Sequence, residues 1–98
     1  MNPAKVAREQ VEILTDLPNI GKAMAADLHL LGIHKPSDLT GQNPYTMYER
    51  LCAIGGSKHD LCVLDVFISI TDFMNGKEPQ PWWHYTAERK HTLANQST

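Results

Sequence analysis

Residues 17–28 read LPNIGKAMAADL, and this stretch decides the fold that we expect. Pro18 fixes its own backbone and disfavours a helical conformation at Leu17, so a helix that precedes it must end there. Asn19 and Gly21 follow, and both residue types tolerate the positive φ that a tight turn often requires. The stretch therefore predicts a hairpin at its start, with one helix before the turn and another after it.

The turn, residues 17–21, brings a helix N-terminus to the surface. We expect Ile20 to insert between the two helices and to fix their angle. The backbone N–H groups of Gly21, Lys22 and Ala23 then lack partners within the following helix, and the helix dipole favours negative charge beside them. The arrangement predicts an anion site, to which Lys22 adds a positive charge.

The segment before the hairpin carries the signals of a first helix. Asn2 followed by Pro3 is typical of an N-cap with proline at the first helical position. We expect this helix to end near Thr15. Its one buried side consists of Val6, Val11, Ile13 and Leu14. With the hairpin and the helix after it, this segment predicts a helix-hairpin-helix motif.

Further helices are predicted after the hairpin, each with a start or stop signal. In order they are residues 22–31 stopped by Gly32, a short turn at 36–39, residues 44–54 opened by Asn43 and Pro44, and a long helix that begins at a capping box in residues 57–60 and ends at Asn75. Strand signals are scarce, since no alternating run is bounded by a tight-turn dipeptide. The predicted fold class is all-α, with about five helices around a single helix-hairpin-helix motif in a SAM-like orthogonal bundle.

The long helix after residue 60 is apolar around most of its circumference. Its polar residues Asp65, Ser69 and Asp72 recur at spacings of four and three, so they share one narrow stripe. Such a helix lies either in the centre of the core or against a partner chain. In a small single domain we expect the central position, and a dimer interface is the alternative.

The sequence changes character near its end. Pro79 and Pro81 disfavour regular helix before an aromatic cluster at residues 82–85, which reads WWHY. We expect this cluster to fold back over the core, with one tryptophan buried and the other partly exposed. Stacking of Trp82 and Trp83 on nucleic-acid bases is the alternative.

Length and charge bound the function. A chain of 98 residues builds one domain with one modest core. Residues 1–91 are predicted to form the helix-hairpin-helix domain, and residues 92–98 a frayed tail in which Leu93 is the only large apolar side chain. The formal net charge is −2, and no basic stripe is visible. This argues against a strongly electrostatic DNA binder, because Lys and Arg supply most non-specific affinity.

No signal peptide or membrane span is expected. The N-terminal residues carry charges and lack an apolar h-region. The longest apolar run, residues 61–70, is interrupted by Asp65 and is too short to span a bilayer. We therefore expect a cytoplasmic protein without membrane contact, in which Cys52 and Cys62 stay reduced.

Several further stretches carry a resemblance to a known family. They are GIHKPSDL at residues 32–39, YERLC at 48–52, DLCVLDVF at 60–67 and PWW at 81–83. From about Leu14 to about Tyr85 the chain resembles a bacterial family of pathogenicity-locus or mitomycin-resistance-like proteins. A weaker similarity is to the C-terminal domain of Sxy/TfoX-type competence regulators. These resemblances imply an all-helical domain and no established enzymatic activity.

The hairpin itself resembles those of the helix-hairpin-helix class, which usually read PGIG. In that class the hairpin backbone amides contact DNA phosphates, and carried over to this chain the contacts fall on Ile20, Gly21, Lys22 and Ala23. One departure concerns Asn19, which stands where DNA-binding hairpins usually have glycine. We expect its side chain to crowd the surface that a phosphate backbone would approach.

Two other clusters contain chemically active residue types. Cys52, His59 and Cys62 include one pair at ligand spacing, whereas a structural zinc site needs four ligands. Ser57, His59 and Asp60 have the residue types of a catalytic triad, but they lie at a helix start and fit a cap better. The remaining histidines show no metal-like spacing; they are His29, His34, His84 and His91. We therefore expect no metal, no cofactor and no catalytic residues.

Two functions of different classes remain open. The first is a non-enzymatic module that contacts the backbone of duplex DNA weakly and without sequence preference, within a DNA-transaction complex. The second is a protein-interaction or homodimerisation module in which the hairpin is purely structural. An enzyme ranks third, because no paired carboxylates, activated nucleophile or metal ligands can be assembled from the sequence.

Overall fold

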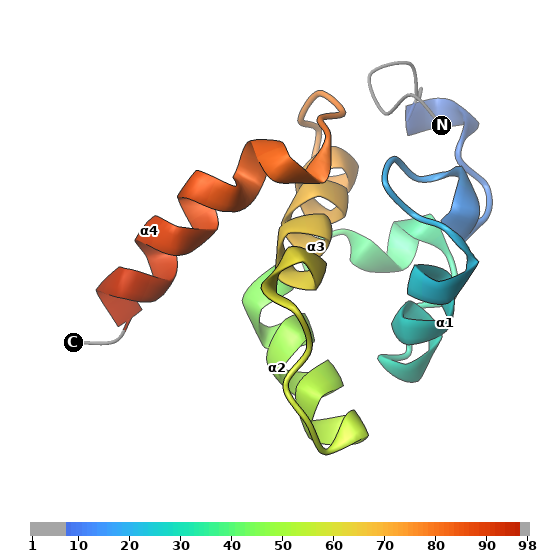
Figure 1. Ribbon diagram of the computed structural model, residues 1–98. Helices are drawn as coiled ribbons and strands as arrows, with labels where there is room; N and C mark the ends of the chain where they lie inside the picture. The colour runs from blue at the N-terminus through green and yellow to red at the C-terminus, as the bar shows by residue number, and fades with distance from the viewer. Residues whose placement is uncertain (1–7, 97–98) are drawn as a thin grey trace.

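The computed structural model describes residues 8–96, and every regular element in this range is helical (Figure 1). The α-helices are α1 (Lys22–Leu30), α2 (Pro44–Gly55), α3 (Leu61–Met74) and α4 (Thr86–Gln96). Short 3-10 helices occupy Arg8–Gln10, Leu14–Asp16, Pro36–Leu39 and Trp82–Tyr85. The predicted all-α class and approximate helix count are confirmed. Within residues 8–96, no helix combines the length and hydrophobicity needed to cross a membrane.

Helix α3 forms the centre of the molecule. It packs against α2, α4 and the 3-10 helices Pro36–Leu39 and Trp82–Tyr85. Every side chain from Leu64 to Thr71 is buried, and Phe67 has no exposed surface. Because full burial of one large apolar side chain contributes roughly 1.5–3 kcal/mol, α3 supplies much of the free energy of folding. The predicted central position of this helix is confirmed.

Local signals fix the ends of the main helices. Asn43 Oδ1 accepts hydrogen bonds from the backbone N–H groups of Tyr45 at 2.9 Å and Thr46 at 3.3 Å, and so caps α2. Gly32 and Gly76 follow α1 and α3 with φ of 82° and 108°. Both glycines therefore close helices in the left-handed conformation that the sequence predicts.

The capping box predicted at residues 57–60 is wrong. The cap of α3 is Asp60, whose Oδ1 accepts a hydrogen bond from the backbone N–H of Cys62 at 3.0 Å. The Tyr48 hydroxyl donates to the backbone oxygen of His59 and holds this linker against α2. Because aspartate caps a helix as well as serine does, the helix begins later than the sequence predicted.

The helix predicted before the hairpin is also wrong over the described residues. Instead of one helix, the chain forms two separate 3-10 turns at Arg8–Gln10 and Leu14–Asp16. Asp16 gives the reason, because its Oδ2 accepts the backbone N–H groups of Glu12 at 3.0 Å and Ile13 at 3.1 Å. Such side-chain bonds compete with helical ones. As a result Ile13 is 59% exposed instead of facing the core.

The predicted start of that helix, at Asn2 and Pro3, lies outside the described residues. The start therefore stays a prediction.

The C-terminal segment contains a helix that the sequence did not predict. After Pro81 the chain forms the 3-10 helix Trp82–Tyr85 and continues directly into α4. In Figure 1, α4 leads away from the other helices toward the C-terminus. Residues 92–96, which were expected to fray, belong to α4, and Leu93 packs against the core. This apolar contact favours helix where composition alone indicated a tail.

A buried ion pair ties α4 to α3. Asp65 has no exposed surface, and its carboxylate accepts hydrogen bonds from Arg89 Nε at 2.9 Å, Arg89 Nη2 at 3.3 Å and Thr86 Oγ1 at 2.8 Å. The bond to Asp65 raises the pKa of the Arg89 guanidinium. Because both carboxylate oxygens are engaged, the pair fixes the orientation of α4. At this position the polar stripe of α3 is an attachment point and not a solvated face.

The aromatic cluster folds back as the sequence predicts. Trp82 is partly buried and packs against the core, whereas Trp83 is 63% exposed. Their rings meet edge to face, with centroids 5.6 Å apart. Tyr85 is buried, and its burial raises the pKa of its hydroxyl to about 12. The packing role predicted for this cluster is confirmed for Trp82 and Tyr85.

Candidate functional site

The hairpin at residues 17–21 is a tight turn built around Asn19. Its φ is 69°, and among the described residues other than glycine it is alone in having a positive φ. The backbone N–H of Ile20 donates to the Leu17 carbonyl at 3.4 Å and closes the turn. Asparagine enters the left-handed region more readily than most residues. The sequence named both Asn19 and Gly21 as able to adopt a positive φ, and Asn19 is the one that does.

The side chain of Asn19 points inward, contrary to our expectation. Its amide nitrogen donates to Ser69 Oγ at 3.2 Å and to the Gln80 carbonyl at 2.9 Å. The hairpin is therefore held by α3 and by the segment that precedes the aromatic cluster. The predicted crowding of the outer surface is wrong, because two partners distant in the sequence draw this side chain into the protein.

Gly21 lies at the N-cap of α1 with its backbone extended, at φ −102° and ψ −173°. Any residue can adopt this conformation. A Cβ built on Gly21 would meet no atom within 4 Å. Neither backbone strain nor internal packing therefore requires glycine here, and the missing side chain leaves the adjacent amide groups open to solvent.

The first amide groups of α1 lie next to this open space. The first helical hydrogen bond runs from the Ala25 N–H to the Gly21 carbonyl at 3.0 Å. Within residues 8–96, no acceptor takes up the N–H groups of Gly21, Lys22 or Ala23, and all three residues are exposed. Unpaired N–H groups and the positive end of the helix dipole together suit an anion.

The predicted site residues do not all share this surface. Gly21, Lys22 and Ala23 are exposed and adjacent, as the anion site requires. Ile20 differs, because its side chain is buried in the core and its N–H is already used inside the turn. The hydrogen bond between Asn19 and Ser69 orients the hairpin from its inner side. Both residues were singled out from the sequence, but no local pattern predicted their contact.

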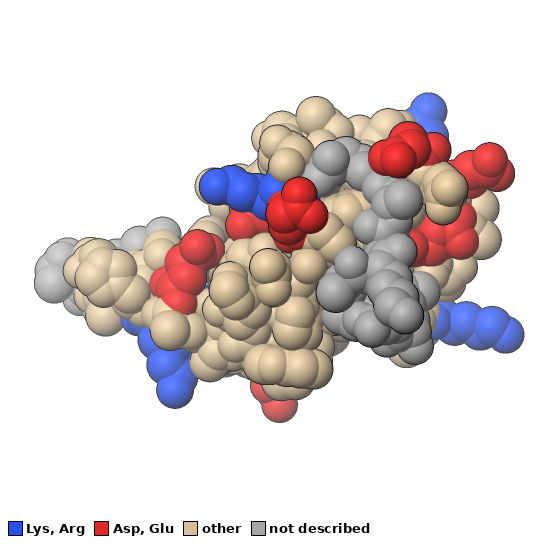
Figure 2. Space-filling model, turned by 90° about the horizontal axis from the view of Figure 1, so that it is seen from above, with Lys and Arg blue, Asp and Glu red and all other residues tan. Residues whose placement is uncertain are grey.

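The charges around the hairpin are mixed. Lys22 is exposed within the site, and Asp16 precedes the turn. Hydrogen bonds from the backbone of Glu12 and Ile13 lower the pKa of Asp16, which favours its charged form. On the face seen in Figure 2, basic side chains stand apart from one another, and the described residues form no basic stripe there. An anion at the hairpin meets the positive charge of Lys22 together with the negative charge of Asp16, so it gains little net attraction from them.

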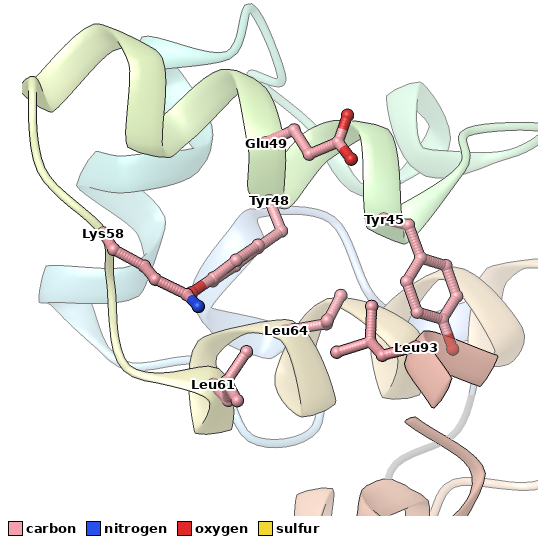
Figure 3. Close-up of a pocket in the computed structure, with 7 residues that line it drawn as sticks. All are labelled: Tyr45, Tyr48, Glu49, Lys58, Leu61, Leu64 and Leu93. Atoms are coloured by element: carbon pink, nitrogen blue, oxygen red, sulfur yellow. The ribbon is translucent and has the colours of Figure 1, made fainter. Parts of the chain in front are cut away.

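A pocket of about 130 Å³ lies between α2, α3 and α4 (Figure 3). Its walls are largely apolar, and its lining residues are Tyr45, Tyr48, Glu49, Lys58, Leu61, Leu64 and Leu93. Burial, with a smaller effect of Cys52, raises the pKa of the Tyr48 hydroxyl to about 12. Pockets for drug-sized ligands usually measure roughly 300–1,000 Å³, so this one suits a single small ring at most.

The other clusters singled out in the sequence are engaged locally. The backbone N–H of His59 donates to Cys52 Sγ at 3.4 Å, and Asp60 caps α3. Burial is the main cause that raises the pKa of the Cys62 thiol, which disfavours its thiolate. Over the part of the chain that the structure describes, no group of three or more His, Cys, Asp or Glu side chains converges.

The chain matches one family model and is similar in sequence to a known protein. Residues 7–91 match the model of the Pathogenicity locus family, Cdd1. Over 83 residues the chain is 40% identical to mitomycin resistance protein McrB of Streptomyces lavendulae, and the match covers 85% of this chain and 79% of that protein. No solved structure matches the chain significantly.

Proposed function

The chain belongs to the Pathogenicity locus family, and we propose that it is a non-enzymatic module that binds the backbone of duplex DNA weakly and without reading sequence. The observation that carries this proposal is the row of unpaired, exposed N–H groups at Gly21, Lys22 and Ala23. A phosphate oxygen is an anionic acceptor that these groups can bind together. Phosphate contacts carry no base information, so the binding is independent of sequence.

The absence of a side chain at Gly21 supports this proposal. Neither its φ nor its packing requires glycine, although glycine is among the residues that helix N-caps prefer. A phosphate backbone that lies against the start of α1 needs the space that a side chain would fill. The inward position of Asn19 keeps the same surface clear.

The affinity follows from the charges. Lys22 is the basic side chain within the site, and Asp16 opposes an approaching phosphate. Few counterions are released when so few phosphates are neutralised, so binding is weak and depends little on salt. Such a module acts within a larger DNA-transaction complex, where other contacts supply affinity.

We further propose that the hairpin is a variant of the helix-hairpin-helix motif. In this variant the 3-10 turn Leu14–Asp16 stands in place of the first helix, and α1 is the second. The turn Leu17–Asn19 and the buried Ile20 keep the features on which the likeness rests. The name of the Streptomyces lavendulae relative adds a setting, mitomycin resistance, in which the proposal can be tested in cells.

A protein-interaction module is the second candidate. It requires an exposed apolar surface, and the large apolar side chains that are at least half exposed are Ile13, Leu30, Ile54 and Trp83. Clusters of exposed apolar side chains mark interaction sites, whereas single ones are normal on any surface. Light scattering across a range of concentrations tests this candidate, since self-association would raise the mass.

A titration of labelled duplex at two salt concentrations tests the leading function. We expect a Kd on the order of 10⁻⁵ M or weaker at physiological salt and a log–log salt slope near about −2. Gly21→Val should fold normally, because its backbone is extended and its Cβ enters open space, but it should abolish binding. Unchanged binding by a folded Gly21→Val variant would overturn the proposal.

A further inference from the structure

The C-terminus of α1 brings two histidines together. After α1 ends at Leu30, Gly32 adopts a φ of 82° and reverses the chain. The backbone N–H of Ile33 donates to the Leu28 carbonyl at 3.0 Å, and that of Gly32 donates to the His29 carbonyl at 3.0 Å. This pair of bonds closes the helix end rigidly. The closure returns His34 to the side of His29.

The two imidazoles face each other through the same ring atom. His29 Nδ1 and His34 Nδ1 lie 2.9 Å apart, with ring centroids 4.9 Å apart and planes inclined by 64°. Both residues are exposed. The backbone of His34 is held in turn, because its N–H donates to Asp38 Oδ2 at 3.0 Å. A neutral imidazole offers a lone pair on one nitrogen, so one proton must lie between these two atoms unless another cation replaces it.

We propose that His29 and His34 form a two-histidine site for a divalent transition-metal ion, best fitted to Cu²⁺ or Ni²⁺. Imidazole nitrogens bind such ions at about 2.0–2.1 Å, so two of them at a right angle are about 2.9 Å apart. A tetrahedral angle would separate them by about 3.3 Å, which makes Zn²⁺ the poorer fit. The observed separation of 2.9 Å matches adjacent corners of a square-planar ion.

The surroundings of the pair also suit a cation. The C-terminus of α1 carries the negative end of the helix dipole. The carboxylate of Asp38 lies beside the turn, where it accepts the hydrogen bond from the His34 backbone. Because both histidines are exposed, water completes the coordination.

This site is independent of the hairpin at the opposite end of α1. Spacing alone does not predict this pair of histidines, because residues five apart do not share a helix face. The left-handed Gly32 makes the difference, since it takes the second histidine off the helical path.

Isothermal titration of the full chain with Ni²⁺, repeated with Cu²⁺ and with Zn²⁺, tests the proposal. We expect one ion per chain, with Cu²⁺ bound more tightly than Zn²⁺. His29→Gln and His34→Gln should each weaken binding by at least about tenfold, because loss even of an outer-shell partner costs about 10–100-fold. The controls His84→Gln and His91→Gln remove exposed histidines elsewhere and should leave the affinity unchanged.

Electron paramagnetic resonance of the Cu²⁺ form supplies a second readout. The wild type should show two equivalent nitrogen ligands, and each site variant one. Binding that survives loss of both His29 and His34, or that falls equally in the controls, would overturn the proposal. Circular dichroism checks that each variant is folded.

Discussion

The side-chain amide of Asn19 donates a hydrogen bond to Ser69 Oγ at 3.2 Å, across 50 residues of sequence. Ser69 Oγ donates in turn to the Val66 carbonyl at 2.6 Å, within the buried part of α3. The same Asn19 nitrogen also bonds the Gln80 carbonyl. The hairpin is therefore fixed to the central helix, and its orientation determines which amide groups of α1 face solvent.

Substitution of Asn19 should separate its two roles. Asn19→Gly keeps the positive φ but loses two hydrogen bonds, which should cost about 1–3 kcal/mol. Asn19→Ala loses the bonds and also strains the turn, which should add about 1–2 kcal/mol. Urea denaturation of both variants measures the difference. Equal stability of the two variants would contradict a role for the left-handed backbone.

Loss of the ion pair between α3 and α4 should be costly. Arg89→Met leaves the buried carboxylate of Asp65 without its charged partner, and such losses cost about 3–5 kcal/mol. Replacing Asp65 by Asn in the same variant should recover part of that stability. Lys90→Met, on an exposed neighbour, is the control. If chemical denaturation gave Arg89→Met and Lys90→Met the same free energy of unfolding, α4 would not depend on the pair.

Asp72 should make stability depend on pH. Burial raises its pKa above the usual 3.8, and Lys77 offsets part of the shift. The folded chain therefore holds this proton more tightly than the unfolded chain, so protonation of Asp72 favours folding. This stabilisation is fully present below the unfolded pKa and is lost as pH rises through the folded pKa. Asp72→Asn should therefore melt higher than the wild type at pH 7, with the difference shrinking in acid.

Asp38→Asn provides the opposite control for that measurement. Backbone hydrogen bonds lower the pKa of Asp38, so its contribution is present above the unfolded pKa and is lost as pH falls through the folded pKa. The variant should melt lower than the wild type at neutral pH. Melting curves between pH 3 and pH 7 that show the same trend for both variants would refute the assignment.

Truncation of a side chain in α3 should destabilise the protein more than truncation of an exposed one. Ile68 is 2% exposed, so Ile68→Ala should destabilise the fold by about 2–5 kcal/mol. Ile54 is 50% exposed, and the same truncation there should cost much less. Light scattering at matched concentrations should give the same mass for both variants and the wild type. A mass that falls only for Ile68→Ala would mean that α3 is an interface.

Local signals in the sequence predicted most of the fold. The cap at Asn43 and the glycines after α1 and α3 act within a few residues, so their patterns can be read directly. The central position of α3 follows from its apolar circumference. These features depend on neighbours in sequence, and the structure confirms them.

Features that depend on distant partners were missed. The inward turn of Asn19 requires Ser69, and α4 is anchored by the pair of Arg89 and Asp65. The first helix fails because Asp16 takes backbone amide groups that a helix would use. In each case a polar side chain has more than one possible hydrogen-bond partner, and the apolar periodicity of the sequence does not show which partner it binds.

The hairpin amides are the centre of this account, and one charge reversal tests them most directly. Lys22→Glu and Lys90→Glu change the net charge equally, and both lysines are exposed, but only Lys22 lies at the start of α1. Fluorescence anisotropy with a labelled duplex at low salt should show binding for the wild type and for Lys90→Glu. Lys22→Glu should lose it for every duplex sequence, since phosphate contacts do not distinguish bases. Equal binding by the two variants, or none by the folded wild type, would contradict DNA binding at this hairpin.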